Sequence, residues 1–449
     1  MNAESIKNCV RQDNNETGFA SRRNIIYPIR IRFPGAPSML FANPNACFTP
    51  YPDALRRILD IDTARQSGAW LAHWPLIERG ATPLWNLPGA AARFGIAALA
   101  VKDESLRSSL GSFKALGAPV ALLRLALRLM PEARFEPQAL FAGRHAGALA
   151  ALTVISATDG NHGKALAAAA QSLGCACVIV LHARVSAERE RAIAAHGARI
   201  VRIAGNYDES VEHAARLARE QGWHVVSDTS YEGYEAIPRD VMQGYGVIAA
   251  ELLAQAAGQP PFTHVILQGG VGGLAAGIAS YLWEHFGASR PRFLVVEPAQ
   301  ADCLYQSAIA GRPAKASGSV DSVMAGLACG EASPLAWRIL QPCIDAFLTI
   351  DDADATLAMR ALAAGVDGDV PVLAGESGAA GHAGLAVLMR DRALAVRAGL
   401  DANSRVVLIN TEGATAPGVY ASLTGEAAEA VIARRQAWLD DAARLLLDA

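Results

Sequence analysis

One lysine in this chain has surroundings that suggest covalent chemistry. Lys114 stands in the segment Leu-Gly-Ser-Phe-Lys-Ala-Leu-Gly (110–117), directly after the strand-like residues 97–105. Small neighbours let another molecule approach the amine, and an amine at a turn-to-helix junction can hold an aldehyde cofactor as a Schiff base. Burial and a lowered amine pKa are the expected means of activating it. The alternative is an ordinary exposed lysine at a helix start, because lysines are seldom buried.

A run of glycines supplies a candidate anion site. Gly269-Gly270-Val271-Gly272-Gly273 follows the apolar residues 264–267 and opens a predicted helix at 274–278. Exposed backbone N–H groups at a helix N-terminus bind anions because they point outward and carry partial positive charge. We therefore expect the phosphate group of a cofactor at this run.

The same glycines permit a second interpretation. The pattern Gly-x-Gly-x-x-Ala at 270–275, followed by a strand that ends in Glu297, imitates the dinucleotide fingerprint of a dehydrogenase. The acid lies 27 positions beyond Gly270, whereas the fingerprint places it about 20 residues on. A dehydrogenase would also not require the Lys114 segment. The sequence thus favours a cofactor phosphate and leaves a dehydrogenase as the alternative.

A polar turn lies between a predicted strand and a predicted helix. Thr158-Asp159-Gly160-Asn161-His162-Gly163 follows the apolar residues 153–157 and precedes the helical residues 164–167. Such a turn places polar side chains at the carboxyl end of a strand, although the same residue types also serve as ordinary loop chemistry. We expect His162 to be structural, because a histidine between glycines in a turn usually satisfies local hydrogen bonds.

The order of these segments is more specific than any one of them. Along the chain come Lys114, the turn 158–163, the glycine run 269–273, Gly375-Glu376-Ser377-Gly378 and Asn410-Thr411-Glu412-Gly413. This succession resembles the fold-type II pyridoxal-phosphate enzymes, the group of threonine dehydratase and cysteine synthase. Within that group it is most similar to the diaminopropionate ammonia-lyases, and the resemblance covers about residues 45–440.

The resemblance implies a role for each segment around pyridoxal 5′-phosphate. Lys114 would form the Schiff base, Asn161 would bind the phenolic oxygen, and residues 269–273 would hold the phosphate. Thr411 would offer its hydroxyl to the pyridine nitrogen, and because a hydroxyl cannot protonate that nitrogen, elimination is favoured over transamination. The alternative for Thr411 is a helix N-cap with Ala414 at the third helical position.

The resemblance also implies two catalytic carboxylates. Asp159 stands where most fold-type II relatives carry a small residue; an aspartate is the ammonia-lyase form and implies a second base on the opposite side of the substrate from Lys114. Such a base could take the Cα proton of a D-amino acid while the lysine serves the L-isomer. Asp228 matches a segment that contributes to the substrate pocket, or is a solvated turn residue. Gly111-Ser112 departs from the Asn-Ala usual in the ammonia-lyases, which leaves the substrate open.

The expected activity is elimination of ammonia from 2,3-diaminopropionate, which yields pyruvate and two molecules of ammonia. Serine or threonine dehydration, or β-replacement with the same cofactor, is the first alternative, and Asp159 argues against it. A nicotinamide-dependent dehydrogenase and a catalytically silent binding protein are alternatives from other classes. The resemblance further implies a homodimer.

Composition limits the partners. The 449 residues include 40 basic and 43 acidic side chains, and 52% are hydrophobic. With charges nearly balanced and no long run of one sign, neither nucleic acid nor an anionic membrane is expected, whereas a small-molecule substrate fits. Seven scattered cysteines favour free thiols in the cytoplasm, and the ten histidines show no metal-ligand spacing.

Short apolar runs alternate with helical stretches, which is typical of parallel sheets covered by helices on both faces. The strand-like runs are 177–181, 200–203, 264–267, 293–296 and 405–409. We predict an α/β protein with two doubly wound parallel-sheet lobes and the active site in the cleft between them. The predicted domains are an N-terminal arm (1–35), a large domain (36–106 and 231–449) and a small domain inserted into it (107–230).

Overall fold

The computed structural model describes residues 39–158, 160–205, 207–259 and 261–447. The predicted N-terminal arm lies outside the described residues, and so does Asp159. Within the described part of the chain, the strands form two separate sheets, one of seven strands and one of four.

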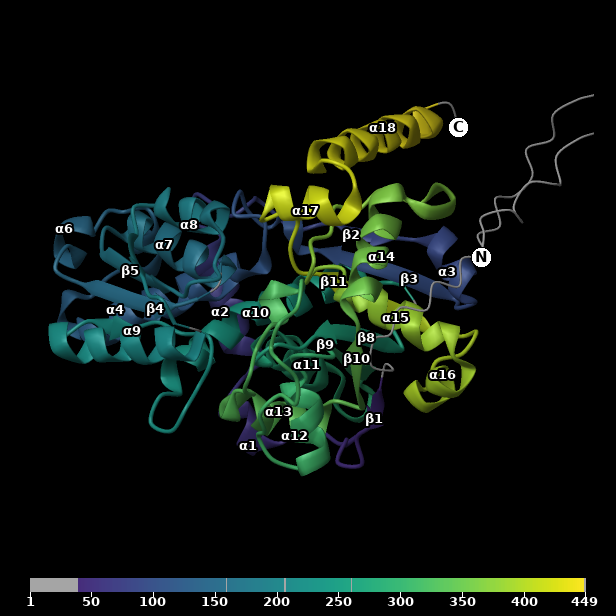
Figure 1. The fold of residues 1–449 in the computed structure, drawn as a ribbon, viewed down its shortest axis with the longest axis horizontal. Coiled ribbons are helices and arrows are strands. Elements are labelled where there is room, and N and C mark those ends of the chain that lie inside the picture. Colours follow the sequence, from purple (N-terminus) through teal and green to yellow (C-terminus); the bar gives the residue numbers. More distant parts are fainter. Residues whose placement is uncertain (1–38, 159, 206, 260, 448–449) are drawn as a thin grey trace, which may run out of the picture. The chain divides into compact units, whose positions relative to one another are not determined.

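The seven-stranded sheet has the strand order β1-β10-β9-β8-β11-β3-β2 (Figure 1). Its five central strands run parallel, and the short edge strands β1 and β2 are antiparallel to their neighbours. The strands are β1 (Leu40–Ala42), β2 (Leu84–Asn86), β3 (Ala98–Asp103), β8 (His264–Gln268), β9 (Arg292–Pro298), β10 (Ala346–Ile350) and β11 (Arg405–Asn410).

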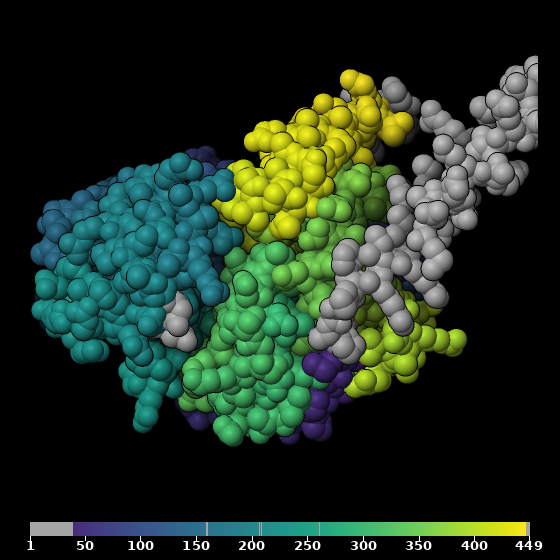
Figure 2. Space-filling model, viewed as in Figure 1, coloured from purple at the N-terminus to yellow at the C-terminus, as the bar shows by residue number. Residues whose placement is uncertain are grey.

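The four-stranded sheet is parallel throughout, with the order β6-β5-β4-β7. Its strands are β4 (Thr153–Ala157), β5 (Ala176–Leu181), β6 (Arg199–Arg202) and β7 (His224–Val225). All four come from one continuous stretch of chain, whereas the large sheet takes strands from both before and after that stretch. In Figure 2, the blue-green segment and the green-to-yellow segments meet along one face.

Helices cover both faces of the large sheet, because apolar side chains of its strands point alternately to one face and to the other. In β8, Val265 and Leu267 enter one hydrophobic core, while Ile266 between them enters another. The first core contains α10 (Ala236–Gln255), α11 (Gly273–Phe286) and α13 (Pro334–Cys343). The second contains α14 (Asp352–Ala364), α15 (Ala380–Arg390) and α16 (Arg392–Ala398). Because successive side chains of a strand point to opposite faces, a strand apolar at every position needs cover on both sides.

The small sheet is covered in the same way. Val154 of β4 packs with α4 (Ala118–Leu129) and α7 (Asn161–Leu173), whereas its neighbour Ile155 packs with α9 (Tyr207–Gln221). The remaining helices are α1 (Asp53–Arg56), α2 (Ile61–Leu71), α3 (Pro88–Phe94), α5 (Pro137–Phe141), α6 (Ala146–Leu149), α8 (Ala187–Ala194), α12 (Cys303–Ala310), α17 (Pro417–Thr424) and α18 (Ala428–Leu447). None of the helices described here combines the length and apolar character needed to cross a membrane.

The predicted α/β class with two parallel sheets is confirmed. Each strand-like run identified in the sequence forms a strand, with bounds shifted by one or two residues. The sequence reading missed β10 and the three short strands β1, β2 and β7.

Candidate active site

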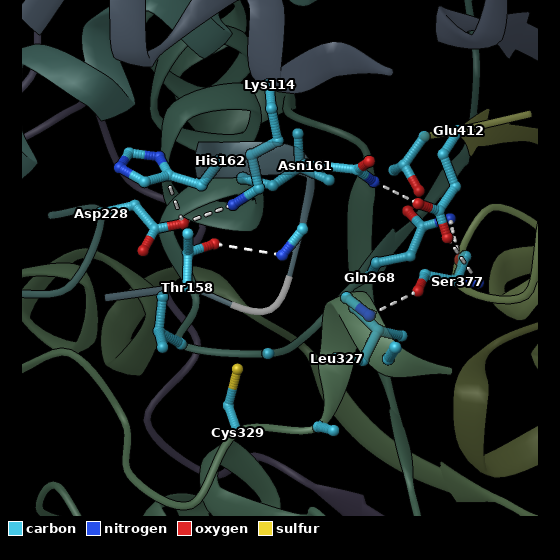
Figure 3. A pocket seen from close by; sticks show the side chains of 18 of the residues that line it. Lys114, Thr158, Asn161, His162, Asp228, Gln268, Leu327, Cys329, Ser377 and Glu412 are labelled. Atoms are coloured by element: carbon cyan, nitrogen blue, oxygen red, sulfur yellow. Dashed lines mark hydrogen bonds and ion pairs between the residues drawn. The ribbon is translucent and has the colours of Figure 1, made fainter. Parts of the chain in front are cut away.

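A cavity lies where the carboxyl ends of strands from both sheets come together (Figure 3). Loops that follow β4, β7, β8 and β11 all contribute to its wall, which is where α/β proteins commonly bind ligands. Its lining includes Lys114, Thr158, Asn161, His162, Asp228, Gly269, Gly270, Val271, Gly273, Ser377, Thr411 and Glu412. Most residues selected from the sequence therefore share one cavity. Gly272 belongs to the same loop but is not part of the lining.

Lys114 projects into this cavity from a short 3₁₀ helix, Phe113–Leu116, that precedes α4. Its Nζ forms an ion pair with Oδ2 of Asp228 at 2.5 Å. The two side chains are 17% and 19% exposed, so neither is an ordinary surface residue. Ser112 occupies the N-cap position of the 3₁₀ helix but makes no side-chain capping hydrogen bond. The interpretations of Lys114 as an exposed helix-start lysine and of Asp228 as a solvated turn residue are therefore wrong.

The ion pair determines the charge state of both groups. Burial alone would lower the pKa of Lys114, but the adjacent Asp228 carboxylate outweighs burial and raises the pKa of the amine. Burial opposes ionisation of Asp228 too, yet the adjacent Lys114 ammonium lowers the pKa of the Asp228 carboxyl. The expected lowering of the amine pKa is therefore wrong for this arrangement, because a carboxylate in contact stabilises the ammonium. Before Lys114 can act as a nucleophile, its proton must leave, and the ion pair with Asp228 opposes that loss until the two groups separate.

His162 supports the loop that carries Asp228. Its Nε2 lies 2.9 Å from the carbonyl oxygen of Val226, and its Nδ1 lies 3.9 Å from Oδ2 of Asp228 (Figure 3). Burial lowers the pKa of the imidazole, so the ring is neutral near pH 7. A neutral ring that bridges α7 and the segment after β7 positions the carboxylate without adding a second cation.

Asn161 is the first residue of α7, and its Nδ2 donates a hydrogen bond to Oε2 of Glu412 (Figure 3). The backbone N–H of Ser377 donates to the other carboxylate oxygen of Glu412 at 3.0 Å. Glu412 thus joins the turn after β4 to the loop before α15. Sequence reasoning missed this role, although Glu412 stands beside Thr411 in one of the segments on which the resemblance rests.

Glu376 is a second buried acid, close enough to Glu412 for the two charges to interact. Burial, and then the charge of Glu412, raise the pKa of Glu376 to about 7. The Oε1 atom of Glu376 is buried without a hydrogen-bond partner among the described residues, and Nη2 of Arg189 lies 4.0 Å from it. Two buried carboxyl groups side by side do not both ionise readily, so near neutral pH Glu376 holds a proton for part of the time.

Thr411 is buried, being 2% exposed, and directly follows β11. Its carbonyl oxygen accepts a hydrogen bond from the N–H of Phe113 at 3.0 Å, which places Thr411 beside the Lys114 segment. The next helix is α17, which begins at Pro417 with Ala416 as its N-cap. The alternative that Thr411 caps a helix is therefore wrong.

The glycine run forms a tight loop between β8 and α11. Gly270 and Gly272 have φ angles of +65° and +97°, which residues with a side chain adopt at a cost. A Cβ atom on Gly269 would lie 2.3 Å from Cγ of Glu297, and one on Gly272 would lie 2.7 Å from Cδ1 of Leu340. A side chain on Gly269 or Gly272 would therefore force the loop to move, and the loop leads into the N-terminus of α11 beside the cavity.

Glu297 explains why the dinucleotide interpretation fails. Its carboxylate is fully buried and accepts hydrogen bonds from the N–H groups of Leu304 (2.9 Å) and Tyr305 (2.7 Å) at the start of α12. The acid therefore cannot reach a ribose in the cavity. Burial raises the pKa of Glu297 to about 8, so the group behind the glycine loop is largely uncharged at neutral pH and does not repel an anion.

The fold and the cavity together define an α/β enzyme class in which a partly buried lysine shares a cavity with a glycine loop at a helix N-terminus. Residues 76–412 match the family described as "Pyridoxal-phosphate dependent enzyme", and the chain belongs to this family. It is 39% identical to the diaminopropionate ammonia-lyase of Salmonella typhimurium over 358 residues, covering 78% of this chain and 89% of that protein.

Two solved structures agree with this assignment. The holo diaminopropionate ammonia-lyase from Escherichia coli superposes with a TM-score of 0.77 and 33% identity, covering 86% of this chain and 96% of that chain. The same enzyme in complex with D-serine gives a TM-score of 0.76 and 34% identity with equal coverage.

The residues around the cavity fit pyridoxal phosphate. The glycine loop leads into a helix N-terminus that has no side-chain cap, which suits its phosphate, and the largely uncharged Glu297 does not repel it. The N–H of Gly269 itself donates to the carbonyl oxygen of Val296 at 2.8 Å. A lysine amine is available for the cofactor's aldehyde, and the amide of Asn161 and hydroxyl of Thr411 line the same cavity. The donor set therefore matches a phosphorylated aldehyde.

Proposed function

We propose that this chain eliminates ammonia from 2,3-diaminopropionate, giving pyruvate and two molecules of ammonia. The observation that carries the proposal is the contact between Lys114 and Asp228 in a cavity bordered by the glycine loop. The identity to diaminopropionate ammonia-lyases supports the choice of substrate.

We propose that the residues predicted from the sequence bind pyridoxal phosphate. Gly269 to Gly273 would bind the phosphate, Asn161 the phenolic oxygen and Thr411 the pyridine nitrogen, and Lys114 would attach the cofactor. When bound, pyridoxal phosphate withdraws electrons from the substrate's Cα and so acidifies the Cα–H bond. Lys114 or Asp159 would then take that proton, from opposite sides of the substrate.

Asp228 is suited to the substrate's second amino group. Its carboxylate holds an ammonium ion already, that of Lys114, so it can equally hold the β-ammonium of diaminopropionate. A β-nitrogen must be protonated to leave as ammonia, and a carboxylate beside it keeps it so. This requirement favours diaminopropionate over serine or threonine, whose β-hydroxyl carries no charge. A dehydratase or β-replacement activity is thus the second candidate.

Purified protein supplied with pyridoxal phosphate would be assayed for pyruvate or 2-oxobutyrate release from D- and L-diaminopropionate, serine and threonine. We expect kcat/KM for diaminopropionate to exceed that for serine by more than about 100-fold, as loss of one charge-assisted contact can cost. Equal or greater efficiency with a hydroxy-amino acid would make the protein a dehydratase.

We also propose the division into a small domain (107–230) and a large domain (36–106 and 231–449), because the two sheets separate near these positions. We further propose that the protein is a homodimer in the cytoplasm. Buried free thiols at Cys175, Cys177 and Cys343 suit a reducing compartment. Light scattering of the purified protein would test the oligomeric state.

A further inference from the structure

Tyr245 of α10 carries a hydroxyl with no hydrogen-bond partner among the described residues, although it is 1% exposed. A buried hydroxyl without a partner loses its contacts to water and gains nothing in return, so such groups call for an explanation. Tyr245 also lines the cavity that contains Lys114 and Asp228. Its hydroxyl is therefore placed where a group in the cavity can satisfy it.

Two glycines bring Tyr245 to the Lys114 segment. A Cβ atom on Gly244 would lie 2.0 Å from the carbonyl oxygen of Leu116, and one on Gly117 would lie 2.6 Å from Cε1 of Tyr245. Only residues without a side chain at these positions let α10 pack directly on the 3₁₀ helix that carries Lys114. The close approach holds the tyrosine ring in place, 4.8 Å from the ring of Phe113.

The Lys114 ammonium lies among a small set of groups. It contacts Asp228 and lies 5.1 Å from the ring centroid of Phe113 and 5.8 Å from that of Tyr245. Besides Asp228, the titratable groups around it are Tyr245 from α10, His162 from α7 and Cys329 from the loop before α13. An ammonium has three N–H donors, and Asp228 takes one of them. Among these groups around Lys114, Tyr245 offers an uncharged oxygen atom, that of its hydroxyl.

Lys114 needs a second partner during turnover, if the proposed function holds. When Asp228 holds the β-ammonium of the substrate, that carboxylate is no longer available to Lys114. The displaced lysine amine then needs another acceptor in the cavity. A hydroxyl can accept a hydrogen bond from an ammonium and donate one to a free amine, so it serves the lysine in either protonation state.

We propose that Tyr245 is a positioning residue. Its hydroxyl forms a hydrogen bond with the Lys114 amine whenever Asp228 binds the β-amino group of the substrate. The tyrosine keeps the amine near the reacting atoms, and Asp228 is left free to bind the β-amino group. The hydroxyl makes no hydrogen bond of ordinary geometry among the described residues, and Lys114 is the cation whose charge acts on it.

The test is a double-mutant cycle on cofactor-free protein. Limited acylation with acetic anhydride, followed by mass spectrometry of the Lys114 peptide, measures the reactivity of this one amine. In the wild-type background Asp228 dominates, so Tyr245→Phe should change the labelling rate by less than about twofold. In Asp228→Ala protein, which has neither a carboxylate nor an amide oxygen at this position, the hydroxyl becomes the main acceptor, so adding Tyr245→Phe should raise the rate about fivefold or more, because the ammonium then loses this acceptor as well. Equal effects in both backgrounds would overturn the proposal.

Turnover and stability supply independent readings. With pyridoxal phosphate and diaminopropionate, Tyr245→Phe should lower kcat by about 10- to 100-fold and change KM by less than about threefold. Tyr420→Phe is the matched control, because Tyr420 is fully buried, its hydroxyl also lacks a partner among the described residues, and it is not part of the cavity wall. That control should retain full kcat.

Neither substitution should lower the thermal midpoint. A midpoint of Tyr245→Phe more than about 4 °C below that of Tyr420→Phe would show a structural hydroxyl and overturn the proposal. If the wild-type protein does not act on diaminopropionate, the proposed function fails, while the labelling experiment still decides the role of Tyr245.

Discussion

The Nζ atom of Lys114 lies 2.5 Å from Oδ2 of Asp228, although 114 positions separate the two residues along the chain. Lys114 follows β3 of the seven-stranded sheet, and Asp228 follows β7 of the four-stranded sheet. The charge state of the amine therefore depends on how the segment that carries Lys114 packs against the segment that carries Asp228. Any motion that separates them would also release the amine from its carboxylate.

Replacing Asp228 by asparagine should show whether activity depends on the negative charge of this side chain or on its size. Asp228→Asn keeps the size of the side chain but removes the carboxylate that we assign to the β-ammonium. We expect kcat/KM for diaminopropionate to fall by about 10²- to 10⁴-fold, and activity on serine to fall much less. Parallel losses on both substrates would show that Asp228 acts on a step common to them.

Lys114→Ala should abolish turnover and also the protein–cofactor bond that borohydride can trap. Intact-mass measurement after reduction reads this bond directly and does not depend on the choice of substrate. Lys315→Ala, at a lysine that is 81% exposed, should leave both activity and trapping unchanged. Persistence of a reducible bond in Lys114→Ala would assign the covalent role to a different lysine.

Gly272→Val should weaken cofactor binding by orders of magnitude. Gly272 does not line the cavity, so the valine would not block the phosphate directly; its Cβ would meet Leu340 and force the loop away from its φ of +97°. Bound cofactor can be measured from its visible absorbance. Gly311→Val is the matched control, because Gly311 has a similar backbone conformation, with φ +67°, and no atom near its missing Cβ. Equal cofactor content in the two variants would contradict the assignment of the loop.

Asp159 remains a prediction from the sequence. A base can serve only the side of the substrate that it occupies, and Lys114 is committed to one side. Asp159→Asn should therefore depress elimination from D-diaminopropionate by about 10²- to 10⁴-fold and cost the L-isomer much less. Equal losses on both isomers would mean a structural or shared role, and undiminished activity on the D-isomer would remove Asp159 from the reaction.

The protonation of Glu376 should make stability depend on pH. Its pKa is raised to about 7 in the folded protein from an ordinary value of 4.5, so the folded state favours the protonated acid. The stability that this contributes is complete below about pH 4.5 and is lost as the pH rises towards 7. The free energy of unfolding, measured with urea, should decrease for both the wild type and the Glu376→Gln variant as the pH rises from about 5 to 8. For the Glu376→Gln variant this decrease should be about 1–3 kcal/mol smaller than for wild type. Glu429→Gln, at an exposed position, should follow the wild-type curve.

The local segments were accessible from the sequence because their signals are local. The strand, glycine loop and helix at 264–286 are contiguous, and so are the strand, polar turn and helix at 153–173. Hydrophobic periodicity and turn residues identify such units without knowledge of their neighbours. The order of those units along the chain was then sufficient to indicate the cofactor. The edge strands β1 and β2 were missed because three residues are too few to show a period.

Tertiary structure alone decided which distant residues meet. Asp228 reaches Lys114 across 114 positions, and Asn161 reaches Glu412 across 251, because the tertiary packing brings the loops that carry them to one cavity. The same packing turned Glu297 inward and raised the pKa of Lys114, where its isolated surroundings suggested the opposite. Sequence thus determined which chemical groups the protein has, and packing determined their partners, because burial and charge act through space and not along the chain.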